Sequence, residues 1–135
     1  MKDFRTLIVW RKAHELSLAV YKSASSFPAD EKYGITSQIK RCCVSIEANI
    51  AEGCGRDGDH EFRRFLFISM GSASELDCHL LLARDLELLP NLAYQGLFKQ
   101  LSEVRLMLAA LIRKIDGSSS IANDTRSRSR GAATS

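Results

Sequence analysis

The side chains with potential for metal or acid–base chemistry are few: the 135-residue chain has three histidines and four cysteines. No C-x-x-C pair occurs, which argues against a structural zinc site of the common kind. The Glu-x-x-His motif of carboxylate-bridged metal bundles is also absent. The nearest pattern is Glu75 with His79, which lie four residues apart and so share one helix face. We interpret them as an exposed i,i+4 pair and expect neither a metal nor a cofactor.

The sequence contains no clear motif for nucleophilic catalysis or for nucleotide binding. No G-x-S-x-G elbow is present, so helix packing explains the many serines better. The glycine-rich loop at 53–58 precedes a predicted helix, but it lacks the lysine and the preceding strand of a phosphate-binding loop. Arg56 and nearby backbone N–H groups could still hold an anion, although Asp57 and Asp59 oppose this. We therefore expect a protein that is not an enzyme.

Basic side chains on predicted helices are the remaining candidates for a functional site. The candidates for contacts to nucleic-acid phosphates are Lys40, Arg41, Arg56, Arg63 and Arg64. If several copies of the chain assembled, these residues could line a shared surface. The alternative is solvated helix faces with i,i+4 ion pairs. Charge favours the alternative for a single chain, because the net charge is only +3 and three of the nineteen basic residues lie in the last ten positions.

Four stretches carry the apolar spacing of three and four residues that is typical of amphipathic helices. They span about residues 6–25, 35–52, 59–88 and 91–117. The third presents one continuous face made of Phe62, Phe65, Ser69, Ala73, Leu76, Leu80 and Ala83. The fourth has the most regular heptad, made of Leu97, Leu101, Val104, Leu108, Leu111 and Ile115, with Leu106, Met107 and Ile112 as extra apolar surface beside it.

No strand pattern competes with these helices, so the predicted fold is all-α. Short connections predict an antiparallel up-down-up-down four-helix bundle over residues 1–117. Residues 118–135 are rich in Ser and Arg and are expected to form a disordered tail. Thr6 and Asp59 are the predicted N-caps of the first and third helices. Gly53, Gly55 and Gly117 are the predicted helix stops.

The stretch at 37–56 combines an apolar helix face with small residues, which predicts a closely packed helix seam. Within it, Asn49 is expected to fix helix register through a buried hydrogen bond. Gly71, in the middle of the third helix, predicts a second close approach. Trp10 is interpreted as a core or interface residue, the alternative being a stacking platform for a base. The cysteines are interpreted as reduced thiols of a cytoplasmic protein, because the sequence shows neither a signal peptide nor an apolar run of about 18 residues.

Several segments, taken in order, resemble a known bacterial family. They are Phe4-x-x-Leu7-x-Val9-Trp10-x-Lys12-Ala13, Phe27-Pro28-x-x-Glu31-x-Tyr33-Gly34-Ile35-Thr36-x-Gln38, Arg41-x-x-x-Ser45-Ile46-x-x-Asn49-Ile50-Ala51-Glu52-Gly53, Glu61-Phe62-x-x-Phe65-Leu66 and Gly71-Ser72-x-x-Glu75-Leu76. Over residues 4–115 the chain is similar to the four-helix bundle proteins encoded in the intervening sequences of 23S ribosomal RNA genes, the S23 family. The residues taken as its structural signature are Trp10, Ser45, Asn49, Glu52 and Gly53.

The resemblance implies a bundle that assembles as a homopentamer and has no known enzymatic activity. Related bundles include the accessory protein of diversity-generating retroelements, a positively charged pentameric barrel that binds its reverse transcriptase and nucleic acid. This chain departs from that protein in being nearly neutral. It also has Cys42-Cys43 and Glu47 where family members often carry Ala-Ala or Ala-Val and Pro.

The expected function is therefore a non-catalytic oligomeric scaffold with no membrane role. Its expected partners are RNA, an RNA–protein complex, or a protein of the reverse-transcriptase kind. The alternative is a protein-interaction module with no nucleic-acid role.

Overall fold

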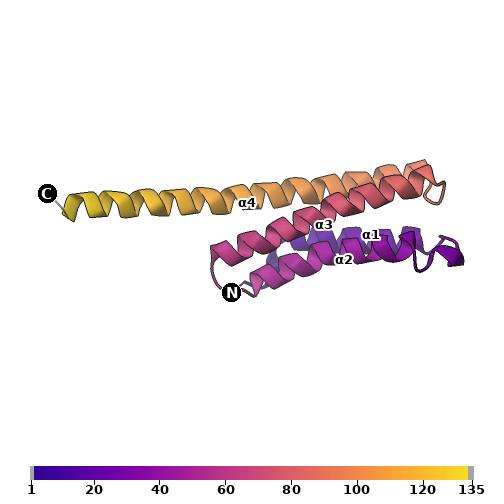
Figure 1. Ribbon diagram of the computed structural model, residues 1–135, viewed down its shortest axis with the longest axis horizontal. Helices are drawn as coiled ribbons and strands as arrows, with labels where there is room; N and C mark the ends of the chain where they lie inside the picture. Colours follow the sequence, from indigo (N-terminus) through magenta and orange to yellow (C-terminus); the bar gives the residue numbers. More distant parts are fainter. Residues whose placement is uncertain (1, 134–135) are drawn as a thin grey trace.

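The computed structural model describes the backbone of residues 2–133 and the side chains of residues 2–118. Two short 3-10 turns, η1 (Phe4–Thr6) and η2 (Ala29–Glu31), accompany four helices: α1 (Ile8–Ala24), α2 (Ile35–Cys54), α3 (Asp59–Asp85) and α4 (Asn91–Ala133). α1 and α3 each pack against both α2 and α4, whereas the diagonal pairs α1–α3 and α2–α4 lie farther apart within the described residues. Figure 1 shows consecutive helices running back and forth beside one another. The predicted all-α four-helix bundle is confirmed.

The core of the bundle follows the predicted helix faces closely. On α3, all seven predicted face residues are buried, and Leu66 joins them. The heptad prediction for α4 needs one correction, because Ile112 is buried and Leu111 is only half-buried. The two residues lie about 100° apart around the helix. Ile112 therefore points into the core, while Leu111 lies on the flank that faces the start of α1.

The predicted N-caps are each displaced by one residue. α1 begins at Ile8, after a separate turn in which the Thr6 hydroxyl donates to the Asp3 carbonyl at 2.7 Å. α3 begins at Asp59 itself, because Gly58 occupies the N-cap position with a φ of 82°. At the other end of α3, Glu87 adopts a left-handed φ of 62°, which lets the Leu88 N–H donate to the Ala83 carbonyl.

Gly53 and Gly55 do not end α2 in the predicted way. Gly53 lies inside α2, and Gly55 follows it with an ordinary right-handed φ of −82°. The N–H of Gly55 donates to the Ala51 and Glu52 carbonyls and so closes the last turn without a left-handed residue. The left-handed glycine is Gly58, at the far end of the loop.

α4 continues past Gly117 to Ala133, so the predicted helix end at Gly117 is wrong. Glycine costs a helix only about 1 kcal/mol relative to alanine, and it stops one only when it turns left-handed. Figure 1 shows this last part of α4 extending well beyond the other three helices. Among the described side chains of α4, the last buried one is Ile115. The division between a bundle at 1–117 and a tail at 118–135 stays a prediction, and residues 134–135 lie outside the described chain.

Among the described helices, only α3 is long and apolar enough to cross a membrane by length and composition. The same test is passed by core helices of bundles, and α3 buries one continuous face against its neighbours. That face accounts for only part of the apolar composition, because α3 also exposes Phe67, Ile68, Leu81 and Leu82.

Candidate functional site

The seam between α2 and α3 is the most extensive helix contact of the bundle. Gly53 lies at its closest point: a Cβ atom added there would lie 2.9 Å from the Phe65 Cβ and 3.1 Å from the Phe62 Cδ1. Gly53 thus serves close packing rather than helix termination. The close helix approach that the sequence predicts at Gly71 is wrong, because a Cβ atom added there would meet nothing within 4 Å.

A small polar network crosses the same seam one helical turn above Gly53. The Asn49 amide donates to the Ser45 carbonyl at 2.8 Å and to the Ser45 hydroxyl at 3.0 Å. That hydroxyl lies 2.8 Å from the hydroxyl of Ser72 on α3. Nearby, the buried Ser69 hydroxyl donates to the Ile46 carbonyl at 2.9 Å. Asn49 therefore reaches α3 only through Ser45, and these contacts place Ser45 opposite Ser72 in the register.

Trp10 lies half-buried over the contact between α1 and α2. Its ring stacks on His14 with centroids 4.9 Å apart, and the edge of Phe4 approaches it at 4.8 Å. The His14 Nδ1 lies 2.8 Å from the Glu47 carboxylate on α2. Both neighbouring rings come from this chain itself, so the indole face toward His14 is not free to stack on a base.

Three of the five candidate basic residues lie in or near the loop between α2 and α3: Arg56 in the loop itself, and Arg63 and Arg64 at the start of α3. Arg56 pairs with Glu52 at 2.9 Å, Arg63 with Asp116 at 2.6 Å and Arg64 with Glu61 at 3.1 Å. The hydrogen bond from Arg64 holds the pKa of Glu61 below its usual value. Three acidic partners therefore offset the positive charge of the three arginines.

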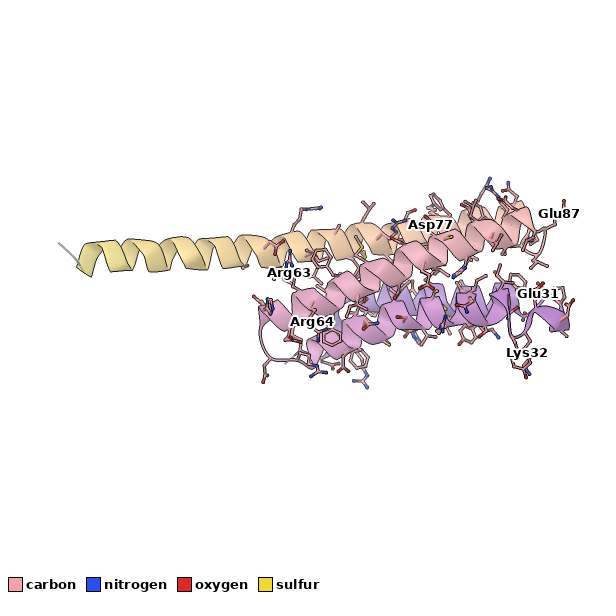
Figure 2. All side chains as sticks on the ribbon, viewed as in Figure 1. Glu31, Lys32, Arg63, Arg64, Asp77 and Glu87 are labelled. Atoms are coloured by element: carbon pink, nitrogen blue, oxygen red, sulfur yellow. The ribbon has the colours of Figure 1, made fainter. Side chains whose placement is uncertain are left out.

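Lys40 and Arg41 lie elsewhere. Both are in the first third of α2, more than about 20 Å along the helix axis from Arg56. Lys40 lies over the Tyr21 ring, and Arg41 donates to Gln38. Figure 2 shows Arg63 and Arg64 at the end of the bundle opposite to Glu31, Lys32 and Glu87. The five predicted basic residues therefore form two groups at different positions along the long axis of the bundle.

A cluster that sequence reasoning missed lies across the α2–α3 seam, at Cys42, Glu75 and His79. The Cys42 sulfur, a Glu75 carboxylate oxygen and a His79 ring nitrogen all lie within 4.8 Å of one another. Burial, together with the adjacent Glu75 carboxylate, raises the pKa of the Cys42 thiol to about 12. Glu75 and His79 do pair at 3.5 Å, but the His79 Nε2 is buried, so the interpretation as an exposed pair is wrong for His79.

The signal for this cluster is split between two helices. The i,i+4 spacing of Glu75 and His79 is visible in the sequence, and Cys42 is one of the small residues of the predicted seam. Joining them requires the register of α2 against α3, which the Ser45–Ser72 and Gly53–Phe65 contacts establish.

An apolar groove opens on another side of the bundle, between the start of α1 and α4. Its lining is Thr6, Leu7, Ile8, Val9, Met107, Ala110, Leu111 and Lys114. Within this lining Ile8 is 57% exposed, and Leu106, which precedes Met107 on α4, is 72% exposed. One helical turn from Ile8 and Met107, the ion pair of Lys12 with Glu103 at 3.6 Å joins the same two helices.

Comparison with known proteins places these features in a family context. The family described as 23S rRNA-intervening sequence protein matches residues 5–110. A protein of unknown function from the S23 ribosomal protein family of Bacteroides thetaiotaomicron has a similar structure, with a TM-score of 0.71 and 24% sequence identity. The similarity covers 78% of this chain and 98% of that one. At this identity it supports the fold alone. No curated protein matches the sequence.

Proposed function

Because the chain belongs to the family of 23S rRNA-intervening sequence proteins, we propose that it is a non-catalytic scaffold that self-assembles through the apolar face shared by α1 and α4. The observation that carries this proposal is the apolar groove between α1 and α4, together with the exposure of Ile8 in its lining and of Leu106 on α4. Neither the family description nor that of the structural neighbour names an activity. Four free cysteines are in keeping with a cytoplasmic location.

The groove has the composition of an interface core. Leu7, Met107 and Leu111 are half-buried on its walls, and Ile8 and Leu106 stand out from the bundle. Contiguous apolar surface of this kind, rimmed by charged residues, is typical of protein–protein contacts. Burying it removes apolar area from water at about 25 cal/mol per Å². A second copy of the chain is the proposed occupant, and five copies are the proposed assembly.

We expect the wild-type chain to have a native mass that is a multiple of its 15.0 kDa, five times that value for the proposed pentamer. Leu106→Glu places a charge in the proposed contact and should reduce the native mass to that of one chain, since burying an unpaired carboxylate is costly. Light scattering after size exclusion measures both. Leu92→Glu is the matched control, because Leu92 is also an exposed leucine of α4 but lies about 20 Å from Leu106 along the helix. A monomeric wild-type chain at micromolar concentration would contradict the proposal.

For the assembled scaffold we propose RNA, or an RNA–protein complex, as the ligand class. The support is the group of Arg56, Arg63 and Arg64 at one end of the bundle, which assembly would repeat once in each copy. Phosphates would have to compete with the acidic partners of these arginines. Contacts to phosphates release counterions, so the proposed binding weakens as the salt concentration rises. That same compensation of charge favours the second candidate, a protein-interaction module with no nucleic-acid role.

We expect Arg64→Glu to weaken RNA retention and to reduce the slope of log affinity against log salt by about 1 for each phosphate that the variant no longer binds. Arg84→Glu is the matched control, because Arg84 is also an ion-paired arginine of α3 but lies at the opposite end of that helix. Binding curves at several salt concentrations measure the slope. Equal affinity and equal slope for the wild type and Arg64→Glu would remove Arg64 from the proposed RNA surface. Partners that survive nuclease in a pull-down would support the protein-interaction module.

A further inference from the structure

Cys42, Glu75 and His79 form a compact donor set that the proposed scaffold function does not use. It offers one sulfur, one carboxylate oxygen and one imidazole nitrogen, with each pair of ligand atoms no more than 4.8 Å apart. In a tetrahedral zinc site, bond lengths of about 2.0–2.3 Å place ligand atoms about 3.5 Å apart. Glu75 is exposed at the rim, so rotation about its side-chain bonds can supply the remaining approach.

The environment of the His79 imidazole adds to this geometry. Its Nε2 is buried and has no hydrogen-bond partner within the described chain. The nearest carboxylate oxygen, on Glu75, lies 3.5 Å away, at the limit for a hydrogen bond. Buried polar atoms are nearly always hydrogen-bonded, so a buried nitrogen with only this long contact, beside a thiol and a carboxylate, has room for a closer partner. A cation that accepts the nitrogen lone pair is such a partner.

We propose that Cys42, Glu75 and His79 bind one divalent transition-metal ion of the zinc type, with the fourth coordination position open to water. A sulfur and a nitrogen donor select against Mg²⁺ and Ca²⁺, which prefer sets of oxygen ligands. The i,i+4 spacing of Glu75 and His79 lets both reach one ion from a single helix face, as paired ligands on metalloprotease helices do. Cys42 completes the set from α2, so the ion ties α2 to α3.

The other cysteines do not belong to this site. The Cys43 sulfur contacts the Lys40 carbonyl at 3.1 Å, and the Ser17 hydroxyl donates to the Cys43 carbonyl on the side of α1. Cys78 is exposed. Cys78→Ser is therefore a matched control, since it removes a thiol that lies next to His79 in sequence but outside the donor set.

The test is titration of the full-length, metal-free, reduced protein with Co²⁺, which reports thiolate coordination in its absorption spectrum. The expected result is one Co²⁺ per chain, with a thiolate charge-transfer band and tetrahedral visible bands that stoichiometric Zn²⁺ removes. Cys42→Ala should lose the charge-transfer band, and Cys78→Ser should retain it. His79→Gln and Glu75→Gln should each bind at least about 10-fold more weakly, because even outer-shell changes cost that much. Glu75→Gln changes a surface side chain and keeps the test decisive if a core variant fails to fold.

Three results would overturn the proposal. The first is that the folded wild type shows no stoichiometric Co²⁺ band. The second is that Cys42→Ala retains the band with unchanged affinity. The third is that Cys78→Ser loses it, which would assign the thiolate to the exposed cysteine.

Discussion

Gly53→Ala is expected to destabilise the bundle by about 1–3 kcal/mol, the usual cost of overpacking a core. The added methyl group would lie 2.9 Å from the Phe65 Cβ and 3.1 Å from the Phe62 Cδ1. A Cβ atom has no torsion by which to move away, and the Phe65 Cβ is fixed to its own backbone. α2 and α3 must therefore separate along their main contact. The substitution also gains about 1 kcal/mol of helix propensity, so the measured loss is a net value.

Gly71→Ala is the matched control for this prediction. Gly71 is another helical glycine, but an added Cβ there meets nothing within 4 Å. It should stabilise the protein by up to about 1 kcal/mol through helix propensity alone. Urea unfolding at one fixed protein concentration compares the two variants, because assembly makes stability depend on concentration. Gains of similar size for both variants would show that α2 and α3 are not in close contact at Gly53.

The contrast between the two glycines shows where sequence reasoning stops. The sequence pattern places Gly71 inside a predicted helix and Gly53 just past the end of one, so it predicts close packing at Gly71 and termination at Gly53. Composition around a glycine does not say which face it occupies relative to a neighbouring helix. Gly53 faces the phenylalanines of α3, and Gly71 faces outward. Which glycine lies against a neighbour depends on how two helices are aligned, and the pattern within one helix does not give that alignment.

The core positions were predictable for a related reason. The period of 3.6 residues is a property of one helix, so a long and regular pattern identifies its buried face without its neighbours. The pattern identified every predicted buried residue of α3. On α4 it was wrong at one position, where Ile112 is buried and its neighbour Leu111 is only half-buried. The Cys42, Glu75 and His79 cluster was missed because its members come from two helices.

The ion-pair partners of the basic residues could be predicted from the sequence only where both partners lie on one helix. Arg63 and Arg64 look like a free positive pair in the sequence. Arg64 has a local partner in Glu61, which an i,i+3 rule anticipates. The partner of Arg63 is Asp116, on α4 and far away in the chain. The charge of Arg63 is therefore compensated only when the first two turns of α3 lie against the end of the buried part of α4.

The run Leu80-Leu81-Leu82 offers the sharpest test of the α3 face, because its three side chains are chemically identical. They are 2%, 39% and 48% exposed. Leu80→Ala should lower the free energy of unfolding by about 2–5 kcal/mol, since it removes buried methyl groups and leaves a cavity in the core. Leu82→Ala should change it by only about 0.5 kcal/mol, because about half of this residue already lies in water.

Denaturant unfolding of the two leucine variants, again at one protein concentration, measures the difference. Helix propensity cannot account for it, because both substitutions replace leucine by alanine within α3. The proposed interface lies on α1 and α4, so assembly leaves the expected result for Leu82 unchanged. A loss at Leu82 as large as that at Leu80 would mean that another copy of the chain covers this flank of α3. The proposed contact through Ile8 and Leu106 would then be incomplete.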